Sequence, residues 1–336
     1  MTPNQLVNDS IVIDAHLDLL KDVLVKRRAG RKNVIVEDYL ESFIQGGMTC
    51  VVSSLYVDSV SPEKDLEEAM AQLAAFYAEL EEGGGRFFLA TCADDIRRAK
   101  KEGKVAIMLA FEGAEPMAGN PDMLRVFYNL GVRILGICWS RSNWAADGSK
   151  FFDYEYVGYG LTDGGRRLLE IAHGLNMLID ISHINEKGFW EVVEGTNKPL
   201  IATHSNTRAL CDTPRNLSDA QIEAMGKVGG VICVNGASLI VNIDDPSLAS
   251  MGQMAAHMKY ESDIIGAGHV GIGFDQCDRF TVHSDDERLK KVFDVIPSHA
   301  QMPLFVQHLF DKGFPESDVR GILGENVLRV IEKTIG

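Results

Sequence analysis

Short apolar runs alternate with longer segments of helical character along the whole chain. The apolar runs are rich in Val, Ile and Leu and are mostly continuous, which is typical of strands buried on both faces of a parallel sheet. Eight of them are predicted as strands: 11–16, 48–56, 104–111, 131–138, 176–181, 199–203, 229–235 and 269–274. Repeated strand-then-helix order with eight strands predicts an α/β fold, a (β/α)8 TIM-like barrel.

The segments between these runs carry helix signals. In residues 62–82, Ser61 is placed to cap the helix, Pro62 stands in its first turn, and three glycines at 83–85 end it. Further helices are predicted near 94–102, 120–129, 161–173, 186–194, 218–227, 247–265, 300–312 and 317–333. Because no linker or low-complexity tract interrupts this order, we expect residues 1–336 to form one barrel domain.

One long irregular stretch, residues 139–160, follows the fourth predicted strand and contains many aromatic residues. A loop of this length within a compact domain is often functional. We expect it to lie over the barrel mouth as part of a substrate wall, and a passive surface loop is the alternative.

Five residues that commonly bind metals stand at the carboxyl ends of apolar runs: His16, Asp18, Glu112, His183 and His204. These strand ends converge on one face of a barrel, the face that carries its chemistry. His16 and Asp18 are two residues apart, so both can point to the same side. Taken singly, each has an ordinary alternative, because Glu112 could be a rim acid paired with an arginine and each histidine could be a hydrogen-bonded core or surface residue.

Five such ligands exceed the three protein ligands that a catalytic zinc usually takes. They suit two metals about 3.5–4 Å apart with a shared carboxylate. In this arrangement His16 and Asp18 hold one metal, His183 and His204 hold the other, and Glu112 bridges them. A metal-bridging hydroxide would be the nucleophile, because a bound metal lowers the pKa of water towards ~7. Zinc is expected, although cobalt, manganese or iron suits the same ligands.

Two further charged residues are candidates for the reaction. Asp275 closes the eighth run and is placed to carry a proton from the attacking water to the leaving amine, with a direct metal ligand or a structural acid as alternatives. Arg215 follows the sixth predicted strand, and its guanidinium can hold a substrate carboxylate through two hydrogen bonds. Arg208 is a rival for that role, and either arginine can be an ordinary surface residue.

Composition and charge indicate which binding partners and which cell compartment to expect. The net charge of −15 argues against nucleic acid, because an acidic surface repels phosphate backbones. No stretch reaches the ~18 apolar residues of a membrane helix. The six cysteines lack CxxC spacing and suit small buried residues. With no signal-peptide pattern at the amino terminus, these features predict a cytoplasmic protein that binds neither membrane nor nucleic acid.

The chain resembles the membrane (renal) dipeptidase family of zinc peptidases, within the amidohydrolase-like barrels, along nearly its whole length. The resemblance is carried by DAHLD, AFEGAEP, NWAADG, GLTDGGRRLLEIAHGLNMLIDISH, THSNTRALCDTPRNLSD, GIGFD and GENVLRV. It implies two zinc ions on the five ligands with Glu112 bridging, proton transfer by Asp275, and binding of the substrate's terminal carboxylate by Arg215. It also implies cleavage of dipeptides, often with a D-residue at the carboxyl-terminal position, opening of β-lactam rings by some members, and frequent homodimers.

The chain departs from this family around the substrate. Trp139 stands where mammalian members carry a substrate-contacting histidine, and its indole N–H can donate a hydrogen bond but not a proton. Gly236 and Ala237 replace bulky groups after the seventh predicted strand, which should enlarge or reshape the pocket. Together with Arg215, Trp139 and Asn143 are predicted substrate contacts.

The third departure follows Asp275, where Cys277 and Asp278 stand in place of the family's usual second acid and glycine. Because the metal ligands are intact, we expect hydrolysis to be retained, and the departures bear on the identity of the substrate. The predicted function is a zinc-dependent dipeptidase of a soluble bacterial type, with L-Xaa-D-Xaa dipeptides as candidate substrates. The alternatives are an amidohydrolase acting on N-acyl amino acids or another small amide, and a non-catalytic metal-binding protein.

Overall fold

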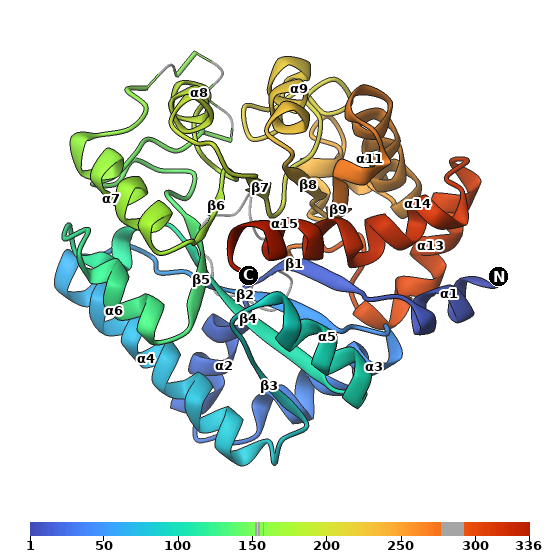
Figure 1. Cartoon of the computed structure of the whole chain (residues 1–336), viewed down its shortest axis with the longest axis horizontal. Coiled ribbons are helices and arrows are strands. Elements are labelled where there is room, and N and C mark those ends of the chain that lie inside the picture. Colours follow the sequence, from blue (N-terminus) through green and yellow to red (C-terminus); the bar gives the residue numbers. More distant parts are fainter. Residues whose placement is uncertain (152, 154, 157, 277–291) are drawn as a thin grey trace.

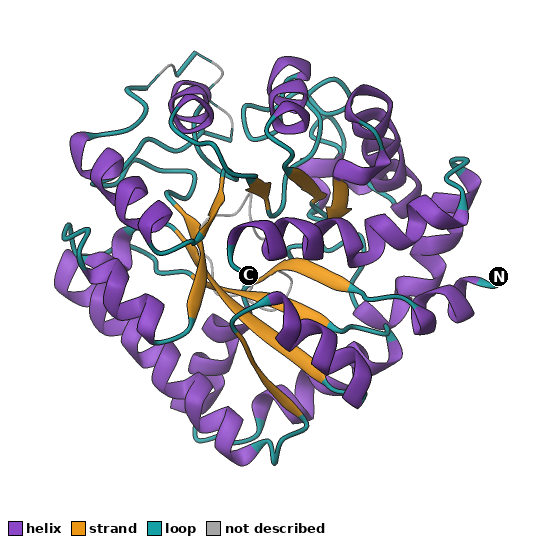
Figure 2. Ribbon diagram, in the orientation of Figure 1, coloured by secondary structure: helices purple, strands orange, loops and turns teal. Residues whose placement is uncertain are grey.

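Parallel strands surrounded by helices form the structure, a computed structural model that describes residues 1–151, 153, 155–156, 158–276 and 292–336 (Figures 1 and 2). In this described part the strands are β1 (Ile13–Leu17), β2 (Cys50–Leu55), β3 (Phe87–Ala90), β4 (Val105–Glu112), β5 (Val132–Gly136), β6 (Leu178–Asp180), β7 (Ile201–Ala202), β8 (Val231–Val234) and β9 (Val270–Ile272). The order β2-β1-β9-β8-β7-β6-β5-β4 closes on itself, because β2 also pairs with β4. The predicted (β/α)8 barrel is thus confirmed.

Strand β3 is additional to the eight strands of the barrel, and the sequence pattern did not predict it. It pairs with the first half of β4, from Phe87 beside Val105 to Ala90 beside Met108, while the second half of β4 pairs with β5. It therefore lies beside the closed ring of eight strands without interrupting it. One consequence is that Glu112 ends the fourth strand of the chain, whereas the sequence pattern placed it after the third.

Helices lie around the outside of the barrel, and the last of them, at 326–334, crosses one end of it (Figures 1 and 2). They are α1 (Pro3–Asp9), α2 (Leu19–Arg28), α3 (Glu41–Gln45), α4 (Pro62–Glu82), α5 (Ala93–Glu102), α6 (Met123–Asn129), α7 (Asp163–Gly174), α8 (Glu186–Glu194), α9 (Asp219–Lys227), α10 (Ser238–Val241), α11 (Met251–Ile265), α13 (Met302–Asp311), α14 (Glu316–Arg320) and α15 (Asn326–Thr334). Among the described residues, no helix is long and apolar enough to cross a membrane.

Two helix predictions show how sequence signals succeed and fail. Helix α4 has the predicted bounds, and the Ser61 side chain accepts a hydrogen bond from the Lys64 amide as its cap. The predicted helix 317–333 is instead broken near Gly324. A Cβ atom at Gly324 would lie 2.6 Å from the Ile11 carbonyl oxygen, so this close approach to the chain entering β1 requires glycine. Tertiary packing decided the break, and no local propensity signals it.

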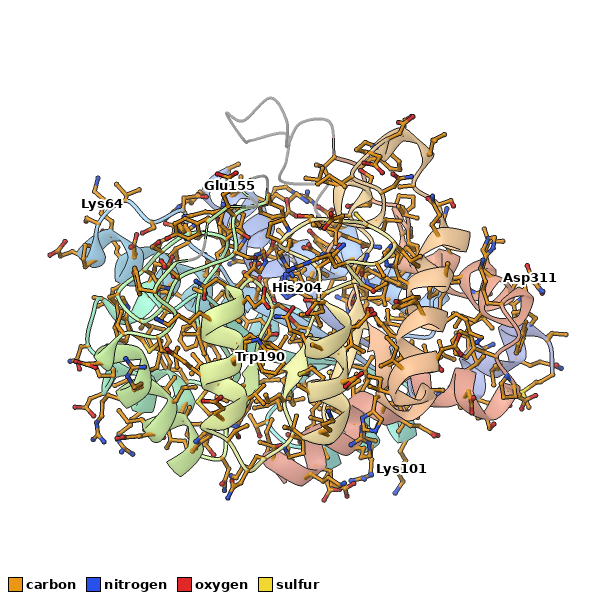
Figure 3. The ribbon with its side chains drawn as sticks, turned by 90° about the horizontal axis from the view of Figure 1, so that it is seen from above. Lys64, Lys101, Glu155, Trp190, His204 and Asp311 are labelled. Atoms are coloured by element: carbon orange, nitrogen blue, oxygen red, sulfur yellow. The ribbon has the colours of Figure 1, made fainter. Side chains whose placement is uncertain are left out.

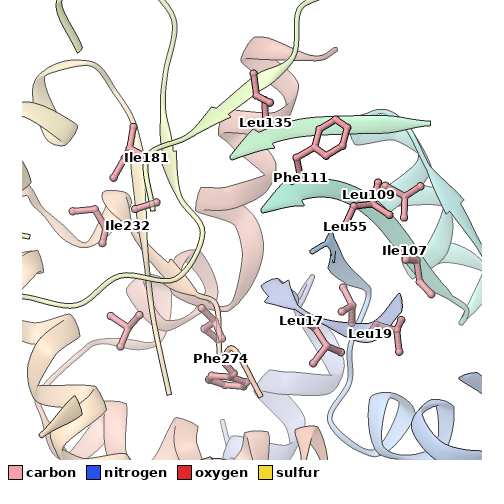
Figure 4. Close-up of a cluster of buried hydrophobic side chains, with 14 of the residues drawn as sticks. Leu17, Leu19, Leu55, Ile107, Leu109, Phe111, Leu135, Ile181, Ile232 and Phe274 are labelled. Carbon is pink, nitrogen blue, oxygen red and sulfur yellow. The ribbon is translucent and has the colours of Figure 1, made fainter. Parts of the chain in front are cut away.

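The alternation of side chains along β4 separates two apolar clusters. Ile107, Leu109 and Phe111 belong to the large cluster between strands and helices (Figure 4). Ala106, Met108 and Ala110 point to the other face and pack in a second cluster with residues of the other barrel strands and of α15. Glu112 continues this second series, since side chains two residues apart share a face. The alternation of side chains along β4 therefore directs the Glu112 carboxylate into the barrel mouth.

Helix α11 buries one carboxyl group with no compensation. Glu261 is fully buried, and neither of its carboxyl oxygens has a hydrogen-bond partner among the described residues. Burial raises its pKa well above the usual value. A neutral carboxylic acid costs far less to bury than a carboxylate, so the folded protein holds this proton.

We predict that Glu261→Gln raises the free energy of unfolding at pH 8. The folded state keeps a proton that the unfolded chain releases above a pKa of ~4.3, so this group lowers stability as pH rises past that value. The glutamine should flatten this decline. Urea unfolding of metal-free protein between pH 5 and 8 measures it, with the exposed Glu223→Gln as control. An unchanged slope in Glu261→Gln would contradict the prediction.

Candidate metal centre

The structure brings all five predicted ligands together at the carboxyl ends of the strands. His16 lies in β1, and Asp18 is the first residue after that strand. Glu112 is the last residue of β4, while His183 follows β6 and His204 follows β7. All five side chains are nearly buried, and Figure 3 labels His204 well inside the outline of the molecule.

Glu112 lies between the three imidazoles. Its Oε1 atom is 3.0 Å from His183 Nε2 and 3.5 Å from His204 Nε2. Its Oε2 atom is 3.6 Å from His16 Nε2. The two oxygens of one carboxylate therefore face two different groups of nitrogen ligands, which is the arrangement that a bridging carboxylate requires.

Asp18 and Asp275 complete the side of the site that contains His16. The Nε2 atom of His16 lies 4.0 Å from Asp18 Oδ1 and also 4.0 Å from Asp275 Oδ1. Asp18 precedes α2 but makes no capping hydrogen bond there, so its carboxylate stays turned towards the site. Asp275 is thus within reach both as a proton carrier and as a ligand, the two roles between which the sequence did not decide.

The residues present fit a metal. Two sets of residues each bring three possible ligand atoms within 4.8 Å of one another. One set is His16, Glu112 and His204, and the other is His16, Asp18 and Asp275. Both His16 Nε2 and Glu112 Oε2 are buried with no hydrogen-bond partner among the described residues. A buried polar atom that makes no hydrogen bond costs free energy of folding. A divalent cation would satisfy both, and imidazole with carboxylate is a typical ligand set for zinc.

The electrostatics of the site reflect crowded carboxylates. Burial lowers the pKa of His16, but the surrounding carboxylates, Glu112 first, outweigh it and raise that pKa to about 10. Burial raises the pKa of Asp275 to about 6, although the charge of His16 opposes the rise. At His183, burial lowers the pKa to about 3, which leaves a neutral imidazole able to bind a metal. The centre thus holds negative charge that a cation would balance.

The backbone is strained where the site residues leave the strands. His183 has φ 67° and Asp275 has φ 53°, in the left-handed region that residues other than glycine rarely adopt. Such conformations cost on the order of 1–3 kcal/mol and persist where surrounding structure holds them, often at functional sites. Gly113, with φ 113°, makes the turn after Glu112, and a Cβ atom there would lie 2.3 Å from Glu115 Oε2.

Polar neighbours that the sequence pattern did not indicate hold three of the site residues. Ser140 Oγ is 2.7 Å from His183 Nδ1, and the Ser54 hydroxyl donates to Asp18 Oδ1. Asn235 Nδ2 donates to Asp275 Oδ2 over 2.8 Å. All three lie at or just after strand ends, so the rule that found the ligands could have drawn attention to them. Serine and asparagine are, however, common at such positions.

The two candidate arginines lie in different environments. Arg215 is buried, and its guanidinium donates to Ser205 Oγ over 2.9 Å and to the His204 carbonyl over 2.7 Å. Its Nε atom has no partner among the described residues. Arg208 is partly exposed and lies 3.8 Å from Glu186 on the surface. The geometry therefore favours Arg215 as the positive group of the site.

Trp139 forms part of an aromatic wall beside His183. Its ring centroid lies 5.6 Å from that of His183, 5.7 Å from that of Tyr56 and 5.8 Å from that of Phe151. The loop predicted at 139–160 thus contributes two of these side chains next to a candidate ligand, and its residues 152, 154 and 157 lie outside the described part of the chain.

Asn143 has a different environment from the one expected of a substrate contact. Its amide nitrogen donates to Glu115 Oε2 and to the Ile137 carbonyl, at 3.0 and 2.9 Å. Its amide oxygen accepts from the backbone amides of Ala145 and Ala146. The side chain therefore organises its own loop, and contact with substrate stays a prediction.

The other positions at which the chain departs from the family pattern are Gly236, Ala237 and residues 277 and 278. A Cβ atom at Gly236 would lie 3.0 Å from the Phe274 carbonyl oxygen and 3.2 Å from the Met254 side chain, so this glycine faces packed chain. The predicted enlargement of the pocket therefore has no counterpart at Gly236. Cys277 and Asp278 lie outside the described residues.

A (β/α)8 barrel with histidine and carboxylate ligands at its carboxyl face is the architecture of metal-dependent barrel hydrolases. The chain belongs to the membrane dipeptidase family, peptidase family M19, whose sequence profile matches residues 2–335. The resemblance predicted from the sequence is thus confirmed. Members of this family are metal-dependent peptide hydrolases.

Individual relatives agree with this assignment. The chain is 32% identical over 275 residues to an "Uncharacterized protein in pqqA 5'region" of Klebsiella pneumoniae, covering 81% of this chain and 97% of that one. It is 27% identical to human dipeptidase 3 over 96% of this chain and 64% of the human protein. A solved metallo peptidase from Rhodobacter sphaeroides, liganded with a phosphinate mimic of the dipeptide L-Ala-D-Ala, superposes with a TM-score of 0.85 at 26% identity, covering 97% of this chain and 100% of that one.

We predict that Glu112→Gln abolishes tight binding at both halves of the centre. The uncharged amide removes the negative charge that faces both groups of ligands, so affinity for zinc should fall by more than ~10²-fold, beyond the loss typical of residues behind the ligands. Competition with a chromophoric chelator measures it. The exposed Glu186→Gln should bind zinc as the wild type does, and loss of only one zinc in Glu112→Gln would contradict a bridging role.

Proposed function

We propose that this protein is a zinc-dependent dipeptidase with a binuclear centre and that L-Xaa-D-Xaa dipeptides are among its substrates. The observation that carries the proposal is the position of Glu112, whose two oxygens face separate imidazole groups. Membership of the dipeptidase family and the likeness to a peptidase liganded with a dipeptide mimic support it. The partner is therefore a small dipeptide.

The proposal divides the ligands around Glu112 into two half-sites. His183, His204 and Glu112 would hold one zinc, and His16, Asp18 and Glu112 would hold the other. When bound, the two ions would lower the pKa of a water molecule and polarise the scissile carbonyl. Cobalt, manganese or iron fits the same nitrogen and oxygen donors.

Asp275 is the proposed proton carrier. The Asn235 amide fixes one of its carboxyl oxygens, while the other faces the centre, 4.0 Å from His16 Nε2. A carboxylate placed beside the centre can act as a general base and, once protonated, as a general acid. In this role it accepts the proton of the attacking water and delivers it to the leaving amine.

Arg215 is the proposed binding group for the carboxylate end of the dipeptide. It is buried, yet both of its hydrogen-bond acceptors are neutral, and it makes no ion pair among the described residues. A buried guanidinium that makes no direct ion pair can still form one with a carboxylate that enters the site. An N-acyl amino acid carries the same carboxylate, so the free amine is what separates the two substrate classes.

The first test is hydrolysis of a dipeptide panel covering L-L, L-D, D-L and D-D stereochemistry by zinc-loaded protein. We expect cleavage that disappears in the chelated control, with L-D substrates among those turned over, and slower cleavage of N-acetyl amino acids at equal concentration. Equal rates with and without a free amine would favour the amidohydrolase alternative. Absence of any cleavage by fully metallated protein would contradict the proposal.

A second prediction concerns Asp275→Asn. The amide cannot transfer the proton, so turnover should fall by roughly 10²–10⁴-fold, the usual contribution of general acid–base catalysis. Zinc content, measured by elemental analysis after dialysis, should stay at the wild-type value because the five proposed ligands remain. Loss of a zinc ion would instead assign Asp275 as a ligand, and unchanged turnover would exclude it as the proton carrier.

A further inference from the structure

A single buried hydroxyl lies behind two of the proposed ligands. Thr203, which follows β7 and precedes His204, is fully buried. Its Oγ1 atom lies 2.5 Å from Asp180 Oδ2, 2.8 Å from His204 Nδ1 and 3.3 Å from His16 Nδ1. These nitrogens are the ones that do not face Glu112, so the threonine contacts both imidazoles from the side opposite the centre.

The number of protons decides the direction of each hydrogen bond. A threonine hydroxyl has one proton to donate and two lone pairs that accept. The Asp180 carboxylate can only accept, so the hydroxyl donates to Asp180. Its two lone pairs then accept from the two imidazoles, which requires a proton on Nδ1 of both His16 and His204. Nε2 is then the atom of each imidazole that faces Glu112 and can bind a metal.

Asp180 is itself held in place. Its Oδ1 atom accepts hydrogen bonds from the backbone amides of Ser182, over 2.9 Å, and of Thr203, over 3.0 Å. The carboxylate is buried at the end of β6, and these two bonds fix the direction of Oδ2 towards the hydroxyl. Ser182 Oγ is the remaining neighbour of the hydroxyl, at 3.5 Å, and it accepts from the His204 amide.

We propose that Thr203, oriented by Asp180, is a positioning residue that accepts a hydrogen bond from Nδ1–H of both His16 and His204 and so turns Nε2 of each imidazole towards its metal. This inference rests on the proposed two-metal centre, in which these imidazoles belong to different half-sites. One hydroxyl therefore prepares both halves before any metal arrives. Ser140, at 2.7 Å from His183 Nδ1, occupies the equivalent place behind the third imidazole only.

The test combines the Nδ1–H groups of metal-free protein with zinc affinity. Nitrogen-15 NMR of the histidine side chains should show a hydrogen-bonded Nδ1–H at both His16 and His204 in the wild type. Thr203→Val, which keeps the shape and removes the hydroxyl, should lose the hydrogen-bonded Nδ1–H signal at both residues and bind both zinc ions about 10–100-fold more weakly. Thr203→Ser keeps the hydroxyl and should restore both properties. Ser140→Ala should disturb only His183 and one zinc.

Asp180→Asn is an independent check if Thr203→Val folds poorly. An amide nitrogen facing the threonine would donate to the hydroxyl, which must then donate to one imidazole, so one of the two Nδ1–H signals should be lost. Unchanged Nδ1–H signals in both Thr203→Val and Asp180→Asn would overturn the proposal. Because the NMR measurement needs neither zinc nor activity, a wild-type protein that binds one zinc would refute the proposed function without deciding this inference.

Discussion

The site depends on one carboxylate placed at the mouth of the barrel. Glu112 is the last residue of β4, and the alternation that directs Ala106, Met108 and Ala110 towards the second apolar cluster also directs Glu112 to the centre. Its two oxygens face different imidazoles, so ligands from β1, β6 and β7 converge on one group. The turn at Gly113 then leads the chain away, and only glycine suits it.

The buried charges of the site explain why its side chains are held by so many polar contacts. Glu112, Asp18 and Asp275 bring three carboxyl groups into one nearly buried volume, where His16 is the imidazole whose pKa rises in response. A buried charge left without compensation is costly, and a polar network is favourable only when its members are satisfied. Hydrogen bonds from Ser54 and Asn235 satisfy part of it. His16 Nε2 and Glu112 Oε2, which lie 3.6 Å apart with no hydrogen bond to any described residue, are the atoms that a cation would contact.

The sequence predicted the barrel and the ligands for a physical reason. Strands buried on both faces leave continuous apolar runs, and a polar residue that ends such a run is conspicuous, as His204 is after PLIAT. Strand β3 escaped notice because it has only four residues, two of them partly exposed, beside a helix ending in three glycines. Thr203 and Ser140 escaped because a hydroxyl at a strand end has no diagnostic spacing. Their roles depend on contacts between strands, which only the fold creates.

The most direct measurement is anomalous diffraction from crystals of the zinc-loaded protein, with data collected above and below the zinc absorption edge. The account predicts two peaks about 3.5–4 Å apart, one on each side of Glu112. Each peak should lie about 2.0–2.2 Å from a different oxygen of that carboxylate. A single peak, or two peaks of which Glu112 contacts only one, would contradict the central claim that this carboxylate joins two metal half-sites.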